Sequence, residues 1–186
     1  TRLVGSEMCI RDRAHPNIKE SQANKALVDA VSDMEGVAVF NLYELSQEIA
    51  FNIDEWSKII SDASAVIYQF PFYWMSAPSL LKKWQDEVFT FLSKTPAVAG
   101  KPLTVVTTTG SEYEAYRSGG RNRFTTDELL RPYQVSAIHS GMSWQTPIVV
   151  YGMGTADAGK NIAEGANLYK QRVEMLIGSS NAGNNW

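Results

Sequence analysis

The chain has 186 residues, of which 44% are hydrophobic and 20% charged, and its formal net charge is −3. These values predict one ordinary soluble domain with a full core. Because lysines and arginines are scattered and form no basic stripe, no nucleic-acid partner is expected. Cys9 is the only cysteine, which excludes an internal disulfide and favours a reducing, cytoplasmic compartment.

An uncharged run spans residues 63–81, but it includes two prolines, three serines and Gln69. These residues argue against a membrane span, which needs about 20 consecutive apolar residues. The first residues of the chain also lack the apolar core of a signal peptide. No membrane insertion is therefore expected. A metal is not expected either, since His139 has no second histidine or carboxylate at a ligand spacing.

The first thirteen residues do not fit the pattern that follows them. A buried strand should lead into the loop that begins at Ala14, but positions 11–13 are Arg, Asp and Arg. Burying three unpaired charges in a central strand costs more than the stability of a whole domain. We therefore predict a non-native or disordered head at residues 1–13, a folded domain at 14–178 and a flexible tail at 179–186. The alternative is a natural head with a short strand at Met8–Ile10.

Apolar periodicity after the head predicts alternating helices and strands. Strands are predicted at 37–42, 64–70, 103–109 and 148–151, with Pro71 ending the second of these. Helices are predicted at 21–35 (ended by Gly36), at 54–61, from Ser76 or Ala77 to about 93, from 125 onward, and from 155 to about 177. Thr125 and Glu128 have the spacing of a capping box. In the helix after Pro71, the inward positions are predicted to be Leu81, Trp84, Val88 and Phe91.

Strands that alternate with helices predict an α/β fold with a parallel sheet covered on both faces. Five such units favour the strand order 2-1-3-4-5, in which strands 1, 3 and 4 are neighbours. The loops that follow those three strands are residues 15–24, 71–75 and 107–116. All three should meet at the carboxyl edge of the sheet, where open α/β sheets bind ligands.

The three loops carry complementary chemistry. The first places His15, Ser21 and Asn24 at a helix N-terminus, which suits a phosphate, although simple helix capping by Ser21 explains it as well. The second offers aromatic faces and backbone amides to a flat ring, unless its aromatics belong to the core. The third offers threonine and tyrosine hydroxyls and the amide of Gly110 to a polar ring edge. Phosphate, flat ring and polar edge together describe a flavin mononucleotide or dinucleotide.

Four segments resemble the NAD(P)H:quinone oxidoreductases: AHPNIKESQAN, YQFPFYWMSAPSLLKKWQDEVF, VTTTGSEYEAY and GGRNRFTTDELLRPYQ. The resemblance covers about residues 14–177, and the block FPFYW-x-x-P-x-LLK-x-W is specific. It implies a flavodoxin-like three-layer sandwich with a five-stranded parallel sheet whose first strand is degraded or replaced here. The family includes soluble quinone reductases, general-stress oxidoreductases and flavin-binding ancillary subunits of glutathione-gated potassium efflux systems.

The resemblance implies FMN or FAD as cofactor, NAD(P)H as co-substrate and a quinone as acceptor. Hydride transfer would run from NAD(P)H through flavin N5 to the quinone by a ping-pong mechanism. Tyr116 resembles the tyrosine that faces the nicotinamide and quinone pocket, which implies a catalytic role. The family's usual double glycine is replaced by Thr109-Gly110. The implied cofactor contacts are His15, Ser21, Gln22, Asn24, Pro71, Phe72, Tyr73, Trp74, Thr108, Thr109, Gly110 and Tyr113.

The same resemblance implies a homodimer. Two other functions stay open. The first is a flavin-bound regulatory subunit that docks on a membrane potassium/proton antiporter. The second is a simple electron carrier, although the aromatic second loop and the weakly acidic composition argue against it.

Overall fold

The computed structural model describes residues 7–11, 22–45 and 51–182. All strand pairings in it are parallel. The strand order is β2-β1-β3-β4-β5, with β6 also paired to β4. The predicted α/β class and order are confirmed, but the sheet has six strands and not the predicted five, because β5 and β6 both pair with β4. The strands are β1 (Glu7–Arg11), β2 (Val37–Phe40), β3 (Ala63–Pro71), β4 (Pro102–Thr108), β5 (Ser143–Trp144) and β6 (Ile148–Val150).

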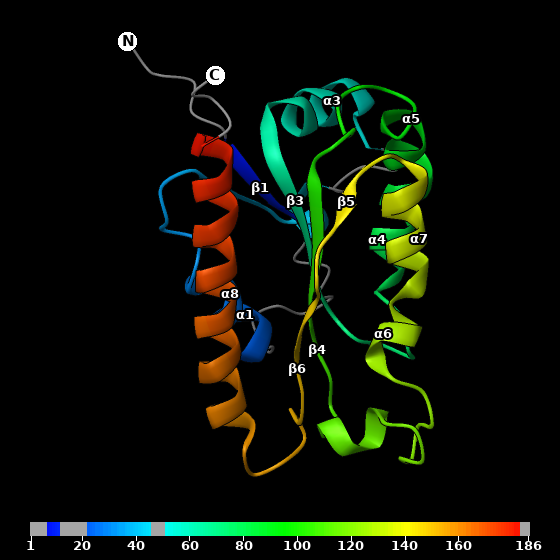
Figure 1. Cartoon of the computed structure of the whole chain (residues 1–186), viewed down its shortest axis with the longest axis vertical. Helices are drawn as coiled ribbons and strands as arrows, with labels where there is room; N and C mark the ends of the chain where they lie inside the picture. The colour runs from blue at the N-terminus through cyan, green and yellow to red at the C-terminus, as the bar shows by residue number, and fades with distance from the viewer. Residues whose placement is uncertain (1–6, 12–21, 46–50, 183–186) are drawn as a thin grey trace.

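Helices cover both faces of this sheet. Figure 1 shows α1 and α8 on one side and α4 to α7 on the other. The helical segments are α1 (Gln22–Asp29), α2 (Leu42–Leu45), α3 (Ile53–Asp62), α4 (Ser79–Trp84), the π-helix η1 (Gln85–Phe89), α5 (Thr90–Leu92), the 3₁₀-helix η2 (Tyr113–Tyr116), α6 (Thr126–Leu129), α7 (Arg131–His139) and α8 (Ala158–Ala182).

The first strand lies where the sequence argued against one. The backbone of Glu7–Arg11 pairs with both β2 and β3, which corresponds to the alternative of a short strand at Met8–Ile10. Without it, the facing edges of β2 and β3 would leave buried N–H and C=O groups unpaired, which is costly whatever the side chains are. The strand ends at Arg11, opposite Tyr68, three residues before β3 ends. The non-native origin of residues 1–13 stays a prediction.

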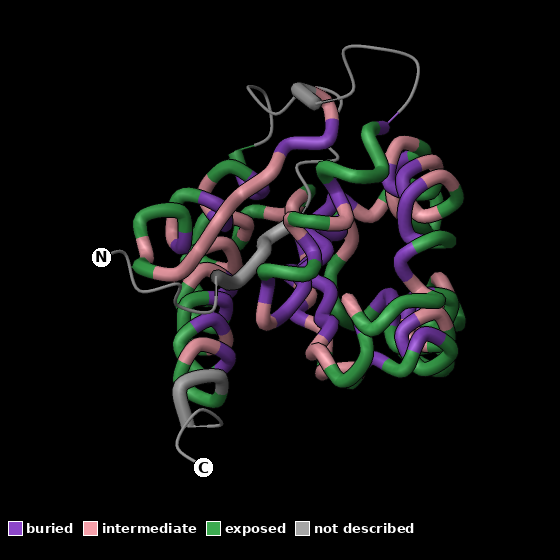
Figure 2. The backbone as a smooth tube through the Cα atoms, turned by 90° about the horizontal axis from the view of Figure 1, so that it is seen from above, coloured by how far each residue is buried: buried purple, intermediate pink, exposed green. Residues whose placement is uncertain are grey.

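The core is divided by the sheet into two clusters. One lies under α3, α4 and α7 and holds Trp56, Trp84 and Tyr133, whereas the other lies under α1 and α8 and holds Leu27 and Tyr169. Figure 2 shows the buried parts of the chain gathered between the two helical layers. β3 is buried almost throughout, as expected for a central strand covered on both faces.

The helix after β3 departs from its predicted pattern. Leu81, Trp84 and Val88 are buried as predicted, but Phe91 is 56% exposed, and Leu92, which is 1% exposed, is buried in its place. The cause is the π-helical turn η1, which inserts one extra residue and shifts the phase of every later side chain. The prediction for Phe91 was therefore wrong.

Other element ends also differ from the predictions. α1 ends at Asp29, because the chain tightens into 3₁₀-type turns such as Val31 N–H to Val28 C=O at 3.0 Å. α8 begins at Ala158 because the Thr155 hydroxyl donates to the Gly152 carbonyl, 2.8 Å away, instead of capping the helix. α8 also continues to residue 182, into the predicted tail. The predicted capping box of Thr125 and Glu128 is confirmed at the start of α6.

Candidate functional site

A cavity of about 430 Å³ lies at the carboxyl ends of β3 and β4, beside the first turn of α1; we call it the strand-end cavity. Residues 22–24, 71–73 and 108–110, which belong to the three predicted loops, meet here as predicted. Its lining includes the predicted residues Gln22, Asn24, Pro71, Phe72, Tyr73, Thr108, Thr109 and Gly110. Met153, Ala158 and Ile162 also line it. Sequence analysis missed them, because the loop after the last strand was not among the three loops considered and the final helix was placed only by its periodicity. His15 and Ser21 lie outside the described residues.

Hydrogen bonds hold the wall of this cavity. Asn24 is 3% exposed, and its Nδ2 donates to Thr108 Oγ1 at 3.1 Å. The buried Gln69 side chain donates through Nε2 to the Asn24 carbonyl at 3.0 Å. The N–H of Phe72 donates to the Thr108 carbonyl at 2.9 Å. Asn24 therefore ties the first turn of α1 to β3 and β4, a role that its predicted phosphate contact did not anticipate.

Gly110 has free space beside it within the cavity. Its φ is not positive, and a Cβ added to it would meet no atom within 4 Å. Its carbonyl accepts from the Gly154 N–H at 2.9 Å, so the backbone here is fixed. Neither backbone conformation nor packing against the protein requires a glycine at this position. Because Gly110 lines the strand-end cavity, this open space is accessible to a ligand that approaches the backbone closely.

Tyr113 and Tyr116 line a second, larger cavity instead. This edge cavity has a volume of about 720 Å³ and lies beside β6, between α8 and the segment from η2 to α6. Tyr116 is 6% exposed, and its ring packs edge-on against Phe72, with ring centroids 6.2 Å apart. Phe72 lines the strand-end cavity, so this ring pair lies between the two. The lining residues of the edge cavity are Tyr113, Tyr116, Arg117, Ser118, Thr125, Thr126, Asp127, Thr146, Pro147, Ile148, Val149, Tyr151, Leu168 and Arg172.

The comparison with known protein families agrees with this geometry. A family model described as "Flavodoxin-like fold" matches residues 13–173. The chain belongs to this flavodoxin-like family. In Bacillus subtilis (strain 168), general stress protein 14 and the uncharacterized NAD(P)H oxidoreductase YdeQ are each 35% identical to it, over 87% of this chain and 94% and 84% of theirs. The glutathione-regulated potassium-efflux system ancillary protein KefG of Serratia proteamaculans (strain 568) is 36% identical, over 74% of this chain and 78% of its own.

Solved structures of flavodoxin-like proteins superpose on most of the chain. General stress protein 14 of Treponema denticola, in complex with FMN, is 27% identical with a TM-score of 0.82, over 92% of this chain and 99% of that one. An NADPH-quinone reductase of P. pentosaceus is 25% identical with a TM-score of 0.73, over 88% and 97%. The flavodoxin-like architecture is thus matched across nearly the whole length of each chain.

In this flavodoxin-like domain, the loop after β3 contains a strained two-residue turn. Tyr73 and Ser76 exchange backbone hydrogen bonds of 2.8 and 3.0 Å, and Trp74 and Met75 between them have φ of 47° and 63°. Such a conformation costs about 1–3 kcal/mol for each non-glycine residue. Trp74 is 98% exposed and is not among the residues that line the strand-end cavity. Its predicted flavin contact stays a prediction.

Two ionisable groups with shifted pKa values, Tyr151 and Glu128, lie near the edge cavity. Burial raises the pKa of Tyr151, and its hydrogen bond to Thr126, 2.6 Å long, only partly opposes this. The pKa of Glu128 is lowered, first by the Thr125 backbone N–H and then by the Thr125 hydroxyl. Tyr151 is therefore a neutral hydroxyl at physiological pH, whereas Glu128 is a carboxylate.

The described part of the flavodoxin-like domain limits two other kinds of site. Among residues 7–11, 22–45 and 51–182, no three His, Cys, Asp or Glu side chains are grouped so that they could hold a metal ion. Within the same residues, no helix is both long enough and apolar enough to cross a membrane.

Proposed function

We propose that this chain is a flavin-dependent NAD(P)H:quinone oxidoreductase that binds FMN in the strand-end cavity. The observation that carries the proposal is the cavity itself, in which the predicted loop residues meet around the open space beside Gly110. Its volume of about 430 Å³ falls in the range of small-molecule and cofactor sites. The FMN complex of a 27% identical relative and the 25% identical quinone reductase give further support, and they favour FMN over FAD.

The residues of the strand-end cavity fit such a cofactor. The backbone N–H groups of the first turn of α1, at Gln22 and Ala23, suit a phosphate, because the first N–H groups of a helix have no partner within it. Phe72 and Tyr73 supply aromatic surface for a flat ring, and the backbone at Gly110 supplies its rim. When bound, FMN supplies the chemistry: it accepts a hydride from NAD(P)H and passes two electrons to the quinone. His15 and Ser21 remain predicted phosphate contacts.

Tyr116 has a different place in this proposal from the one the resemblance implied. Because its ring touches Phe72 and lines the edge cavity, we assign it as a positioning residue that holds the Phe72 ring against the cofactor. A direct catalytic role for its hydroxyl is the competing assignment. The two differ in what replacement by phenylalanine, which keeps the ring, does to turnover.

Flavin binding is tested first. The absorption spectrum of the purified protein identifies a flavin, and titration of the apo-protein with FMN and FAD measures affinity. Gly110→Ala should weaken FMN binding by about fivefold or more, since overpacking costs roughly 1–3 kcal/mol. The matched control is Gly178→Ala on α8, where an added Cβ also meets no atom within 4 Å. Equal FMN affinity in the two variants would contradict the cofactor assignment.

Turnover is tested separately. If nicotinamide and quinone use the same open face of the flavin in turn, the kinetics are ping-pong, and double-reciprocal plots give parallel lines. Intersecting lines would mean that both substrates bind together. Flavin binding without NAD(P)H:quinone turnover would support the FMN site but refute the proposed oxidoreductase activity.

That last result would favour the second candidate, a flavin-bound ancillary subunit of a potassium-efflux antiporter. The observation in its favour is the 36% identity to KefG of Serratia proteamaculans.

We also propose a homodimer, supported by Val135 and Ile138, which are 57% and 62% exposed at neighbouring positions on α7. Light scattering of the purified protein measures its mass. If the chain is a dimer through this surface, Val135→Lys should reduce the measured mass to that of a monomer. A monomeric mass for the unmodified protein would refute the dimer.

A further inference from the structure

The edge cavity lies beside the edge of β6 that faces away from β4. The Val150 carbonyl accepts from the Thr109 N–H at 2.9 Å, so Val150 turns its backbone groups toward β4. Alternate residues of a parallel strand turn theirs to opposite sides, so Val149 directs its N–H and C=O away from β4. Among the described strands, none pairs with that side of β6. Val149 also lines the edge cavity.

Side chains of α8 limit what can occupy this place. Asn161 donates through Nδ2 to the Tyr151 carbonyl at 2.9 Å, and Arg172 donates through Nη1 to the Thr146 carbonyl at 2.7 Å. These bonds lie at the two ends of β6, which is only three residues long. A partner strand would need a longer run of free backbone groups. The edge cavity is therefore suited to a compact ligand and not to an added strand.

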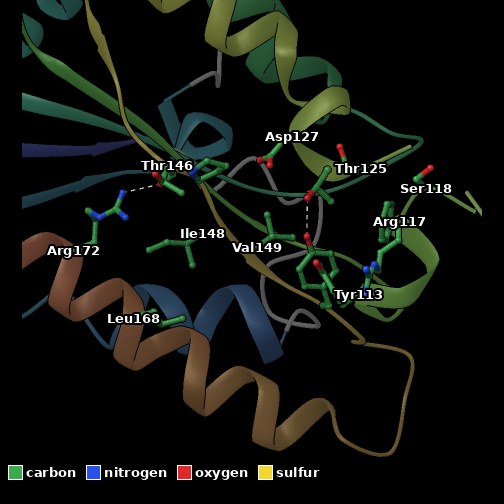
Figure 3. Close-up of a pocket in the computed structure, with 14 residues that line it drawn as sticks. Tyr113, Arg117, Ser118, Thr125, Asp127, Thr146, Ile148, Val149, Leu168 and Arg172 are labelled. Atoms are coloured by element: carbon green, nitrogen blue, oxygen red, sulfur yellow. Dashed lines mark hydrogen bonds between the residues drawn. The ribbon is translucent and has the colours of Figure 1, made fainter. Parts of the chain in front are cut away.

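The lining combines an apolar floor with net positive charge. Ile148, Val149 and Leu168 supply aliphatic surface, and the rings of Tyr113 and Tyr151 lie together with centroids 5.3 Å apart. Figure 3 shows the α8 residues Arg172 and Leu168 on one side of the cavity and Tyr113 and Arg117, from the η2 end, on the other. With two arginines and one aspartate, Asp127, the lining carries a formal charge of +1.

Arg172 is the cation best placed to bind an anion. No carboxylate of the described residues forms an ion pair with it, whereas Arg117 lies 3.6 Å from Glu114. One guanidinium nitrogen of Arg172 is held by the Thr146 carbonyl, which orients the group at the cavity wall. A guanidinium has five N–H donors, so this bond leaves others for a ligand.

We propose that the edge cavity binds a small amphipathic anion, with an aromatic or aliphatic body against Val149 and the tyrosine rings and a single carboxylate or sulfonate on Arg172. The cavity of about 720 Å³ is large enough for such a molecule. It shares no lining residue with the strand-end cavity, so the proposal does not rest on the flavin assignment.

The experiment uses two probes that differ mainly in charge. The anionic probe is 1-anilinonaphthalene-8-sulfonate, and the neutral one is N-phenyl-1-naphthylamine, which lacks the sulfonate. Both are titrated by fluorescence into the full chain, first without FMN and then with FMN added. Arg172→Gln should weaken the sulfonate probe by roughly tenfold or more, because it removes a charge-assisted hydrogen bond. The same variant should leave the neutral probe unchanged.

Two further variants separate the edge cavity from general surface binding. Lys170→Gln removes a positive charge from an exposed position of the same helix that does not line the cavity, and it should change neither affinity. Leu168→Asp should weaken both probes, since it removes apolar surface from the cavity lining. Equal loss in Lys170→Gln and Arg172→Gln, no loss in either Arg172→Gln or Leu168→Asp, or displacement of the sulfonate probe by FMN would each overturn the proposal.

Discussion

The two cavities of this molecule are built in different ways. The strand-end cavity forms where consecutive β–α connections leave the sheet, so the topology alone brings its residues together. The edge cavity is assembled from three segments far apart in the chain, residues 113–127, 146–151 and 168–172. A site of the first kind follows from the alternation of strands and helices. A site of the second kind depends on how closely one helix packs on one strand.

One close contact between α8 and β6 leaves no room for a side chain. Gly165 of α8 lies so close to β6 that an added Cβ would be 2.4 Å from Val150 Cγ2. Residues of α8 before Gly165 line the strand-end cavity (Ala158 and Ile162), and residues after it line the edge cavity (Leu168 and Arg172). The width of both cavities therefore depends on this glycine.

The largest effect is expected from Gly165→Ala, which forces α8 away from β6. Overpacking of this kind costs roughly 1–3 kcal/mol of unfolding free energy. Gly178→Ala, in open space on the same helix, should instead add about 0.5–1 kcal/mol. Urea unfolding of both variants measures the difference. If Gly165→Ala were as stable as the wild type, α8 would be free to move and would not set the cavity widths.

The next effect should be confined to one cavity. Thr125→Ala removes the hydroxyl that accepts from the Glu128 N–H at 3.2 Å, and loss of such a cap typically costs about 1 kcal/mol. Because Thr125 lines only the edge cavity, FMN affinity should stay at the wild-type value while the sulfonate probe binds more weakly. A loss of FMN affinity would show that the two cavities are energetically linked.

A smaller effect tests the ring contact between the cavities. Tyr116→Ala should lower FMN affinity by about two- to tenfold, since an edge-on aromatic pair is worth roughly 0.5–1.5 kcal/mol. Tyr116→Phe keeps the ring and should match the wild type in both FMN affinity and turnover. A loss of turnover in Tyr116→Phe at unchanged FMN affinity would instead assign the hydroxyl to the chemistry.

The smallest effect is on acid stability. Hydrogen bonds from Thr125 hold the pKa of Glu128 below its ordinary value of 4.5. This contribution is fully present above pH 4.5 and is lost as the pH falls through the lowered pKa. Because Glu128 is fully exposed, Glu128→Gln should only slightly flatten the fall in melting temperature below pH 4.5. An unchanged acid slope would mean that the bonds from Thr125 contribute no pH-dependent stability.

Much of the strand-end cavity could be predicted because it depends on local signals. The buried run before Pro71 and the threonine-rich run before Gly110 each mark a strand that ends at the ligand-binding edge. The Thr125–Glu128 capping box is equally local, and it too is present. The first strand was harder to predict from the sequence. Its residues carry no strong apolar strand pattern, and its pairing satisfies backbone groups of β2 and β3.

The features that the sequence could not predict depend on small differences in the placement of helices and loops. A single extra residue in η1 exposes Phe91 and buries Leu92 instead, and nothing in the apolar spacing reveals it. The edge cavity required knowing where α8 lies along β6. Tyr116 was predicted in the right loop, but its contact with Phe72 and its exclusion from the strand-end cavity depend on the fold of residues 111–124.

The strained turn after β3 also gives this protein an intrinsic optical label. Trp74 is 98% exposed, whereas Trp56 and Trp84 are 3% and 0% exposed. Iodide in the solvent can therefore quench the Trp74 indole far more than those of Trp56 and Trp84, and comparison with Trp74→Phe separates its share from those of Trp144 and Trp186. A molecule that seats against this turn changes the quenchable part, whereas unfolding changes the shielded part. Fluorescence of the unlabelled chain thus separates docking at this loop from loss of the core.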